Sequence, residues 1–442
     1  MKPSISFYTL GCRLNQAETA SIQNSFESGG YRVVDFKKTA DIVVINTCTV
    51  TENGDTDTRR LVNRINRLNP GARIALIGCQ AQVQKEKLAR LPNVRWVVGN
   101  ARKMELLSIF EEWSDPDEPQ VITPAIEKKP FIIPVAAIDR QHTRANLKIQ
   151  DGCDFFCSFC EIPYARGRAR SREFGNILLE ARALAAAGHQ EIILTGINVG
   201  TYRHDGKTVR DVIDALEQVE GLERIRISSI EPTTVPEALV RKMASGSKLC
   251  RYLHIPLQSA SDPVLGLMKR KYNFKEFSRF IRMAHETVPE ICLGTDVIVG
   301  FPGETEEHFR ETYDRLLDLP VHYFHVFSYS ARHMAKSRDL ADPVPVSVIQ
   351  KRSELLRELS LRKRRVYFES LAGSVQTVLF EQKKGGWWTG LTDHYVRVNL
   401  RSSQDLQNRM IPVRLGTTDG IAMTGEILNP SIPALRADAG VC

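Results

Sequence analysis

The sequence CDFFCSFC, residues 153–160, places three cysteines on a loop that follows the strand-like segment 146–150. This spacing lets one short loop wrap three thiolates around a cube of iron and sulfide, and it leaves the fourth iron without a protein ligand. A zinc knuckle is the alternative, but no fourth ligand lies at a suitable offset. We therefore expect an iron–sulfur cluster on Cys153, Cys157 and Cys160.

With the aromatic Phe159 before its last cysteine, this motif resembles that of the radical S-adenosylmethionine (radical SAM) enzymes. In that superfamily the open iron binds the amino and carboxylate groups of S-adenosylmethionine, and electron transfer cleaves the bound molecule to a 5′-deoxyadenosyl radical. The resemblance implies a [4Fe-4S] cluster and S-adenosylmethionine as cofactors.

Strand-like segments continue downstream of the cysteine loop. Counting segment 146–150 they make six, and helical stretches such as 174–187 and 274–287 lie between them. This alternation predicts a (β/α)6 partial TIM barrel whose site lies at the carboxyl ends of the strands. The five further strand-like segments are 191–195, 224–228, 252–257, 292–299 and 323–328.

Glycines and polar residues stand at these strand ends, where glycine permits close backbone approach and polar side chains could orient the bound cofactor. Each of them alone also fits a turn or a helix cap, and together they favour a site. The candidate cofactor-binding residues are Phe159, Gly196, Asn198, Ser229, Glu231, Gln258, Asp296 and Gly300.

Three earlier cysteines, Cys12, Cys48 and Cys79, each follow a strand-like segment and a turn. Helix-like stretches separate them, so the pattern predicts a βαβαβ unit with a parallel sheet. The cysteines are 36 and 31 residues apart, close to the roughly 30 residues of one βαβ unit, which returns the chain to the same sheet edge. All three thiols should then meet.

Three thiolates again suit a four-iron cluster with one open iron, whereas structural zinc usually takes four ligands in close pairs. The alternative is that these cysteines are small hydrophobic residues that fill the strand ends. We favour a second cluster. Cys250 and Cys292, at the starts of strands, are expected in the core, and Cys442 at the chain end is expected to be a spectator.

The formal charge of +8 suits a polyanionic partner, although many enzymes with small substrates are equally basic. Four arginines, Arg166, Arg168, Arg170 and Arg172, alternate after the cysteine loop. In an extended chain all four would project from one face and could follow phosphates. A solvated strand edge is the alternative.

The last seventy residues predict a small antiparallel barrel, with strands at 376–381, 395–400, 408–415 and 421–426, after a helical connector at 348–371. Trp387, Trp388 and Tyr395 lie near Arg397 and Arg401 in the sequence. This mixture is expected where unpaired bases stack and phosphates are neutralised, and core aromatic residues are the competing explanation.

Taken together, the whole chain resembles the methylthiotransferase family of radical SAM enzymes. The phrases TLGCRLNQAET around Cys12 and CSFCEIPYARGRARSR from Cys157 look most like the tRNA threonylcarbamoyladenosine methylthiotransferases. The segment WTGLTDHYVRV, residues 388–398, looks like the TRAM domain that binds tRNA. One loop departs from the family: Arg332 is followed by His333, Met334 and Ala335 where Gly and Thr are usual.

The resemblance implies that the cluster on Cys153, Cys157 and Cys160 generates a radical that takes hydrogen from C2 of the adenine at position 37 of tRNA, next to the anticodon. The other cluster supplies sulfur, and a second S-adenosylmethionine supplies the methyl group. Implied partners are tRNA, an electron-donor protein such as a flavodoxin or ferredoxin, and a sulfur donor. Alternatives are a methylthiotransferase for isopentenyladenosine or for a ribosomal-protein aspartate, and a zinc-stapled RNA-binding protein without catalysis.

A chain of 442 residues should form about three domains. We expect an N-terminal methylthiotransferase domain at 1–115, a radical SAM core at 138–370 and a TRAM-like RNA-binding domain at 371–436. No apolar run approaches the roughly 18 residues that cross a bilayer, and no signal-peptide pattern opens the chain. The expected compartment is therefore the cytoplasm, without a membrane partner.

Overall fold

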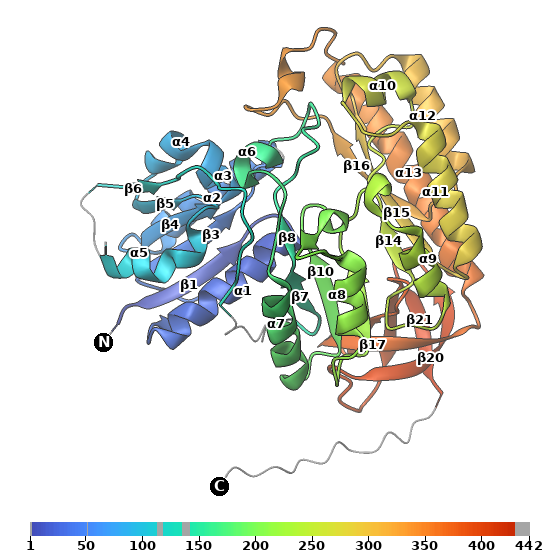
Figure 1. Ribbon diagram of the computed structural model, residues 1–442, viewed down its shortest axis with the longest axis horizontal. Coiled ribbons are helices and arrows are strands. Elements are labelled where there is room, and N and C mark those ends of the chain that lie inside the picture. The colour runs from blue at the N-terminus through green and yellow to red at the C-terminus, as the bar shows by residue number, and fades with distance from the viewer. Residues whose placement is uncertain (1, 51, 113–117, 135–141, 429–442) are drawn as a thin grey trace. The chain divides into compact units, whose positions relative to one another are not determined.

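The computed structural model describes residues 2–50, 52–112, 118–134 and 142–428. The chain divides into two compact units, Met1–Leu359 and Ser360–Cys442, whose elements are labelled in Figure 1. The boundary falls within one long helix, α13 (Val346–Ser370), close to the predicted connector. Within the described ranges, no helix is both long enough and apolar enough to span a bilayer. Cys442 lies outside the described residues.

The first unit begins with a six-stranded parallel sheet in the order β2-β1-β3-β4-β5-β6. Both faces are covered, because one apolar cluster around Phe26 and Trp96 and a second around Val62 and Leu88 lie on opposite sides. Every residue of β3 is buried as a result. The strands are β1 (Ser4–Thr9), β2 (Arg32–Val33), β3 (Ile42–Thr47), β4 (Arg73–Gly78), β5 (Val94–Val98) and β6 (Gln120–Ile122).

The helices of this part confirm the predicted βαβαβ order. They are α1 (Arg13–Ser28), α2 (Glu52–Leu68), α3 (Cys79–Val83), α4 (Lys85–Ala89) and α5 (Leu106–Glu112), with a 3-10 turn at Lys103–Glu105. Three strands that the sequence did not predict, β2, β5 and β6, extend the sheet at its two edges.

Six further strands form the predicted partial barrel. They make two parallel sheets, β13-β10-β7 and β14-β15-β16, which are joined where Cys250 N–H donates to the Ile225 carbonyl at 2.8 Å. The strands are β7 (Ala145–Lys148), β10 (Glu191–Thr195), β13 (Arg224–Ile227), β14 (Tyr252–His254), β15 (Cys292–Val299) and β16 (Tyr323–Ser328). Cys250 and Cys292 are buried here, as expected of core residues.

Helices cover the convex side of the barrel, and Figure 1 shows α11 and α12 running alongside β14 to β16. Their apolar faces join the strand residues in one large cluster that includes Phe277, Leu316 and Phe324. The helices are α6 (Ile162–Arg166), α7 (Phe174–Ala186), α8 (Val209–Leu216), α9 (Glu237–Ala244), α10 (Asp262–Leu267), α11 (Phe274–Thr287) and α12 (Glu306–Asp318). Two short antiparallel strand pairs add β8 (Gln150–Asp151) with β9 (Arg170–Ser171), and β11 (Arg203–His204) with β12 (Lys207–Thr208).

The second unit is a closed five-stranded barrel in the order β17-β18-β19-β21-β20. The prediction of an antiparallel barrel is wrong at one pair, since β19 and β21 run parallel and thereby close the ring. Gly425 permits this closure, because a Cβ atom there would lie 2.5 Å from Val413 Cγ1 and 2.8 Å from Val398 Cγ1. The strands are β17 (Val375–Lys384), β18 (Trp387–Leu391), β19 (Arg397–Arg401), β20 (Met410–Thr418) and β21 (Met423–Ile427).

Candidate active site

The first cysteine triad lies at the carboxyl edge of the N-terminal sheet. Cys12 follows β1, Cys48 follows β3 and Cys79 begins α3 directly after β4, and these three strands are neighbours. Gly11 has a φ of +93°, and a Cβ atom there would lie 2.8 Å from Cys48 Sγ. Gly78 has a φ of +98°. Glycine at both turns therefore lets the chain bend sharply enough for the cysteines to converge.

The three thiols of this triad interact electrostatically. Burial, followed by the nearby charges of Cys79 and Cys12, raises the pKa of Cys48 to about 12. Burial also raises the pKa of Cys12, although the Arg166 guanidinium opposes it. The raised pKa values of Cys12 and Cys48 favour their neutral thiol forms until a cation binds, so a metal would compensate the negative charge of the thiolates.

The second triad lies on the loop between β8 and α6. Each of its sulfurs accepts a hydrogen bond: Cys153 Sγ from Phe155 N–H at 3.4 Å, Cys160 Sγ from Ile162 N–H at 3.4 Å, and Cys157 Sγ from Arg270 Nη1 at 3.2 Å. Burial raises the pKa of Cys153 to about 11 and also raises those of Cys157 and Cys160. The loop thus presents three oriented sulfurs.

In the described part of the chain, His254, Asp296 and His325 each offer one ligand atom, and these atoms all lie within 4.8 Å of one another. For the cysteine triads, the choice between a cluster and a zinc ion rests on the number of cysteines, because three thiolates suit a four-iron cluster with one open iron and structural zinc usually takes four ligands.

Arg270 is a site residue that sequence reasoning missed. It donates hydrogen bonds to the Glu231 carboxylate, the Pro256 carbonyl and the Tyr272 hydroxyl as well as to Cys157. Burial raises the pKa of Glu231, and Arg270 opposes that shift. A lone arginine on a turn carries no sequence signal, since only the fold brings it to Cys157.

The other predicted cofactor-binding residues differ in their hydrogen bonds and in their packing. Asn198 is buried, and in the described chain its Nδ2 has no hydrogen-bond partner, so it can still donate to a ligand. Gln258 adopts a φ of +72°, and its N–H donates to the Asp296 carbonyl at 2.8 Å. Phe159 packs against a small cluster that contains Phe301.

Packing explains two of the predicted glycines. A Cβ atom on Gly300 would lie 2.3 Å from Ile349 Cγ1 on α13, and one on Gly196 would lie 2.9 Å from Gln150 Oε1. Ser229, half-buried, follows β13, and its carbonyl accepts a hydrogen bond from Val199 N–H at 3.3 Å. These contacts give each residue a structural reason to be there, so a cofactor role for them stays a prediction.

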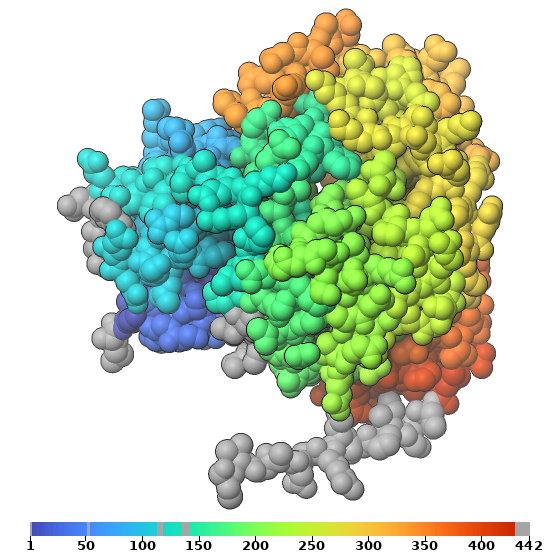
Figure 2. Space-filling model, viewed as in Figure 1, coloured from blue at the N-terminus to red at the C-terminus, as the bar shows by residue number. Residues whose placement is uncertain are grey.

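A buried ionic network joins the sheet to the cysteine loop. The carboxylate of Glu18 on α1 accepts hydrogen bonds from Arg166 at 3.0 Å, from Lys148 at 2.7 Å and from Lys103. Burial would raise the pKa of Glu18, but the charges of Arg166, Lys103 and Lys148 hold it far below its usual range. Asp151 adds a second carboxylate to the network through contacts to Lys148 at 2.7 Å and Arg166 at 3.0 Å. The blue-to-cyan N-terminal residues adjoin the green residues of the barrel in Figure 2.

The prediction that four arginines form one exposed, extended stripe is wrong. Arg166 ends α6, and Gly167 with a φ of +74° turns the chain, so the segment is not extended. The side chains of Arg166 and Arg172 are fully buried, the latter against Glu180, while that of Arg170 is 14% exposed and pairs with Asp151. Carboxylates within the fold thus take the place of phosphates. Arg168 alone is well exposed, at 55%, beside Asp154.

The loop that departs from the family pattern makes a second link. Arg332 donates to Asp55 at 2.7 Å and to Thr49 at 2.9 Å. Glu161, directly after Cys160, accepts a hydrogen bond from Thr49 at 2.8 Å and another from Met334 N–H at 2.7 Å. This loop is therefore tied to the residues that follow one cysteine of each triad.

Two parts of the chain match known protein families. Residues 147–316 match the radical SAM superfamily model, and residues 4–99 match a model described as uncharacterized protein family UPF0004. The threonylcarbamoyladenosine tRNA methylthiotransferase MtaB of Aquifex aeolicus is 37% identical, covering 91% of this chain and 98% of the relative. The protein of that name from Bacillus subtilis is 36% identical, covering 93% of each.

The chain belongs to the radical SAM tRNA methylthiotransferases. A more distant relative within the same set, a tRNA-2-methylthio-N(6)-dimethylallyladenosine synthase of Dehalococcoides mccartyi, is 32% identical, covering 93% of this chain and 96% of the relative. Among solved structures, the radical S-adenosylmethionine methyltransferase TsrM of Kitasatospora setae matches with a TM-score of 0.56 at 16% identity, covering 74% of this chain and 75% of that one. This likeness confirms the fold of the core.

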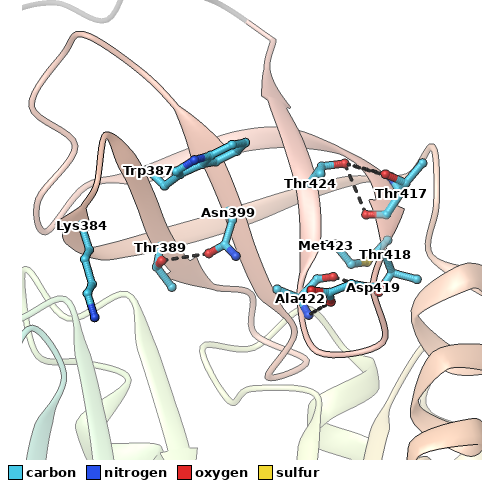
Figure 3. Close-up of a pocket in the computed structure, with 10 residues that line it drawn as sticks. All are labelled: Lys384, Trp387, Thr389, Asn399, Thr417, Thr418, Asp419, Ala422, Met423 and Thr424. Atoms are coloured by element: carbon cyan, nitrogen blue, oxygen red, sulfur yellow. Dashed lines mark hydrogen bonds between the residues drawn. The ribbon is translucent and has the colours of Figure 1, made fainter.

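The C-terminal barrel of this methylthiotransferase carries a pocket of about 540 Å³, shown in Figure 3. Trp387 is 39% exposed on its wall, and the Arg401 guanidinium lies 4.8 Å from the centre of the Trp387 ring. Trp388, in contrast, is a core residue whose Nε1 donates to the Gln404 carbonyl at 3.0 Å. The pocket is lined by Lys384, Trp387, Thr389, Asn399, Thr417, Thr418, Asp419, Ala422, Met423 and Thr424.

Tyr395 and Arg397, two of the residues expected where RNA bases stack and phosphates are neutralised, differ in exposure. Arg397 is exposed at the start of β19, whereas Tyr395 is half-buried in the preceding turn with a φ of +66°. Neither lines the pocket.

The ionic network yields a direct test. Glu18→Gln keeps the shape of the side chain but leaves the buried cations that share this carboxylate uncompensated. We expect it to lower the free energy of unfolding by roughly 3–5 kcal/mol, the usual result of removing one partner of a buried ion pair. Thermal unfolding of the anaerobically purified protein measures the change.

Glu27→Gln is the matched control, because Glu27 is exposed on the same helix and its carboxylate accepts a hydrogen bond from the partly exposed Gln23. It should change stability by less than about 0.5 kcal/mol. Equal unfolding temperatures for the two variants would show that the network contributes nothing to stability.

Proposed function

We propose that this enzyme adds a methylthio group to C2 of N6-threonylcarbamoyladenosine in tRNA, and that each cysteine triad holds one [4Fe-4S] cluster. The proposal is supported by relatives at 37%, 36% and 33% identity whose names specify threonylcarbamoyladenosine. The single observation that carries it is the presence of two oriented three-cysteine groups, at the carboxyl edge of the sheet and on the barrel loop.

The donor chemistry of both triads fits such clusters. Three sulfurs leave one iron of a cubane open, and soft thiolate ligands suit iron in this form. When bound, the clusters and S-adenosylmethionine supply the radical, the sulfur and the methyl group. The hydrogen bonds from Phe155, Ile162 and Arg270 to the second triad donate to the sulfurs, which is the direction that stabilises their ionised form.

Residues of the barrel would hold S-adenosylmethionine beside the second triad. Asn198 offers a buried donor, its Nδ2, that has no partner among the described residues. The half-buried Glu231 carboxylate is tied to Cys157 through Arg270, which fixes its place relative to the triad. Buried polar groups of this kind bind the polar parts of a ligand when it enters.

We expect tRNA to bind to a surface that is separate from the two cysteine triads. The exposed ring of Trp387, backed by Arg401 and next to Lys384, has the aromatic and cationic character on which unpaired bases stack. Arg168 lies 5.2 Å from the ring of the exposed Phe156 on the cysteine loop and is a second candidate for phosphate contact. An electron donor and a sulfur donor are further partners that the proposed chemistry requires.

The roles of the two triads can be separated by one substitution. Cys48→Ala should leave reductive cleavage of S-adenosylmethionine within about twofold of wild type while it abolishes methylthiolation, since only the first triad loses its ligand set. Liquid chromatography of 5′-deoxyadenosine and of digested tRNA nucleosides measures both. Cys292→Ala, in the barrel core, is the control and should retain both reactions. Normal methylthiolation by Cys48→Ala would exclude the assignment.

The identity of the substrate nucleoside has its own test. In a strain that lacks this gene, we expect the mass spectrum of tRNA nucleosides to lose the methylthio form of threonylcarbamoyladenosine and to keep that of isopentenyladenosine. Loss of the isopentenyl product instead would favour the rival methylthiotransferase. Zinc in place of about eight irons per chain, after anaerobic purification, would favour the zinc-stapled RNA-binding protein.

Binding of tRNA to the barrel is tested at Trp387. Trp387→Ala should weaken tRNA affinity by roughly 1–3 kcal/mol, the usual contribution of one stacked base. Trp387→Phe keeps an aromatic ring and should lose less than half of that amount. Filter binding at fixed salt measures both, and equal affinity of wild type and Trp387→Ala would remove this pocket from the RNA surface.

A further inference from the structure

The concave face of the barrel carries a polar cluster in which Asp296, a predicted cofactor-binding residue, lies beside two histidines that have no role in the proposed function. Side chains alternate along β14, β15 and β16, and one face packs into the core through residues such as Leu253, Val297 and Phe324. The opposite face presents His254, Asp296 and His325, of which Asp296 and His325 are direct neighbours across two strands. These three side chains therefore line the inside of the barrel.

Asp296 is the centre of the cluster. Its Oδ1 accepts hydrogen bonds from His254 Nε2 at 2.9 Å and from His325 Nδ1 at 3.2 Å. Burial would raise the pKa of Asp296, but the two histidines hold it well below its usual range. An ionised carboxylate only accepts hydrogen bonds, so the ring nitrogen that faces it carries a proton in each histidine.

His254 is fixed at both ring nitrogens. Its Nδ1 lies 3.2 Å from the Tyr323 hydroxyl, which in turn lies 2.7 Å from the Tyr252 hydroxyl. Gly294 makes room for this arrangement, because a Cβ atom there would lie 2.4 Å from Tyr323 Cζ. His254 thus holds the Asp296 carboxylate in a fixed position.

His325 differs from His254 because it presents a polar atom to the barrel interior. Its Nδ1 is bonded to Asp296, its side chain is 59% exposed, and Nε2 makes no hydrogen bond within the part of the chain that the structure describes. The exposed ring of Phe327 follows on the same strand, 6.4 Å from the His325 ring centre. One oriented nitrogen therefore lies near an exposed aromatic ring.

This cluster lies on the side of the barrel that holds the second cysteine triad. Gln258 N–H donates to the Asp296 carbonyl, and the charge of Asp296 acts on Glu231. Glu231 pairs with Arg270, which contacts Cys157. Hydrogen bonds, together with the electrostatic effect of Asp296 on Glu231, thus connect His325 to the loop where the radical would form.

We propose that His325 determines substrate specificity, by a hydrogen bond from its ring to the polar N6 substituent of the target adenosine. This rests on the proposed function, since a threonylcarbamoyl group carries a carboxylate, a hydroxyl and a urea-type linkage, whereas a dimethylallyl group carries no polar atom. A site built to hydrogen-bond a substrate rejects an analogue without that group by up to about 10⁴-fold or more, whereas an apolar pocket discriminates far less.

The test compares two tRNA substrates that differ only in the N6 substituent, with the fully loaded enzyme. His325→Phe keeps a planar ring but removes the nitrogen. Its kcat/KM for the threonylcarbamoyl substrate should fall by about 100-fold, while that for the dimethylallyl substrate does not fall, so the preference collapses. His325→Gln places an amide near the position of Nε2 and should recover at least about tenfold of the lost preference.

Controls separate this inference from the proposed function. His333→Phe, at an exposed position in the following loop, should keep the wild-type preference. The iron content of each variant shows whether the variant carries its iron–sulfur clusters. If wild type does not methylthiolate the threonylcarbamoyl substrate, the proposed function fails before His325 is at issue.

Two results would overturn the inference itself. One is an unchanged preference in a loaded His325→Phe enzyme. The other is one tightly held zinc or manganese ion per wild-type chain, beyond the iron, that His325→Phe loses, because His254, Asp296 and His325 would then be metal ligands. Asp296→Asn removes the charge that orients His325 and is an independent test. This variant should reduce the preference for the threonylcarbamoyl substrate about tenfold.

Discussion

The position of Glu18 is the constraint on which the rest of the first unit depends. Its buried carboxylate binds Lys103 from the N-terminal sheet region, Lys148 from the first barrel strand and Arg166 from the helix after the cysteine loop. Each of these charges would be costly to bury alone, so they can be buried only when all parts meet in one geometry. The network therefore stabilises one relative placement of the sheet edge and the cysteine loop, and this placement matters because both hold a cysteine triad.

The placement has chemical consequences for both triads. Arg166 bonds to Asn15, three residues from Cys12, and its charge also acts on the Cys12 thiol. Arg166 is also the last residue of α6, the helix that follows Cys160. Its guanidinium therefore links the sheet edge that holds the first triad to the loop that holds the second. Arg332 is a second link between the same two parts of the site, because it forms ion pairs with Asp55 and with Glu161. The two triads lie at carboxyl ends of parallel strands, where ligands bind in α/β sheets.

Much of the fold could be predicted because its signals are local. Strands that end in glycine and cysteine predicted the sheet, and the spacing of Cys153, Cys157 and Cys160 predicted the loop. The barrel strand β18 was missed because two tryptophans and Gly390 do not give an alternating pattern. The arginine stripe was mispredicted because its partners, Glu18 and Glu180, are set by tertiary structure, and one of them is 148 residues away. His325 and Arg270 gave no signal for the same reason.

Hydrogen exchange in Glu18→Gln tests most directly whether this network joins the two halves of the site. The account predicts that, in anaerobically prepared protein, amides of both α1 and residues 150–172 exchange faster than in wild type, while β17 to β21 keep their protection. Unchanged protection of residues 150–172, with faster exchange confined to α1, would contradict it.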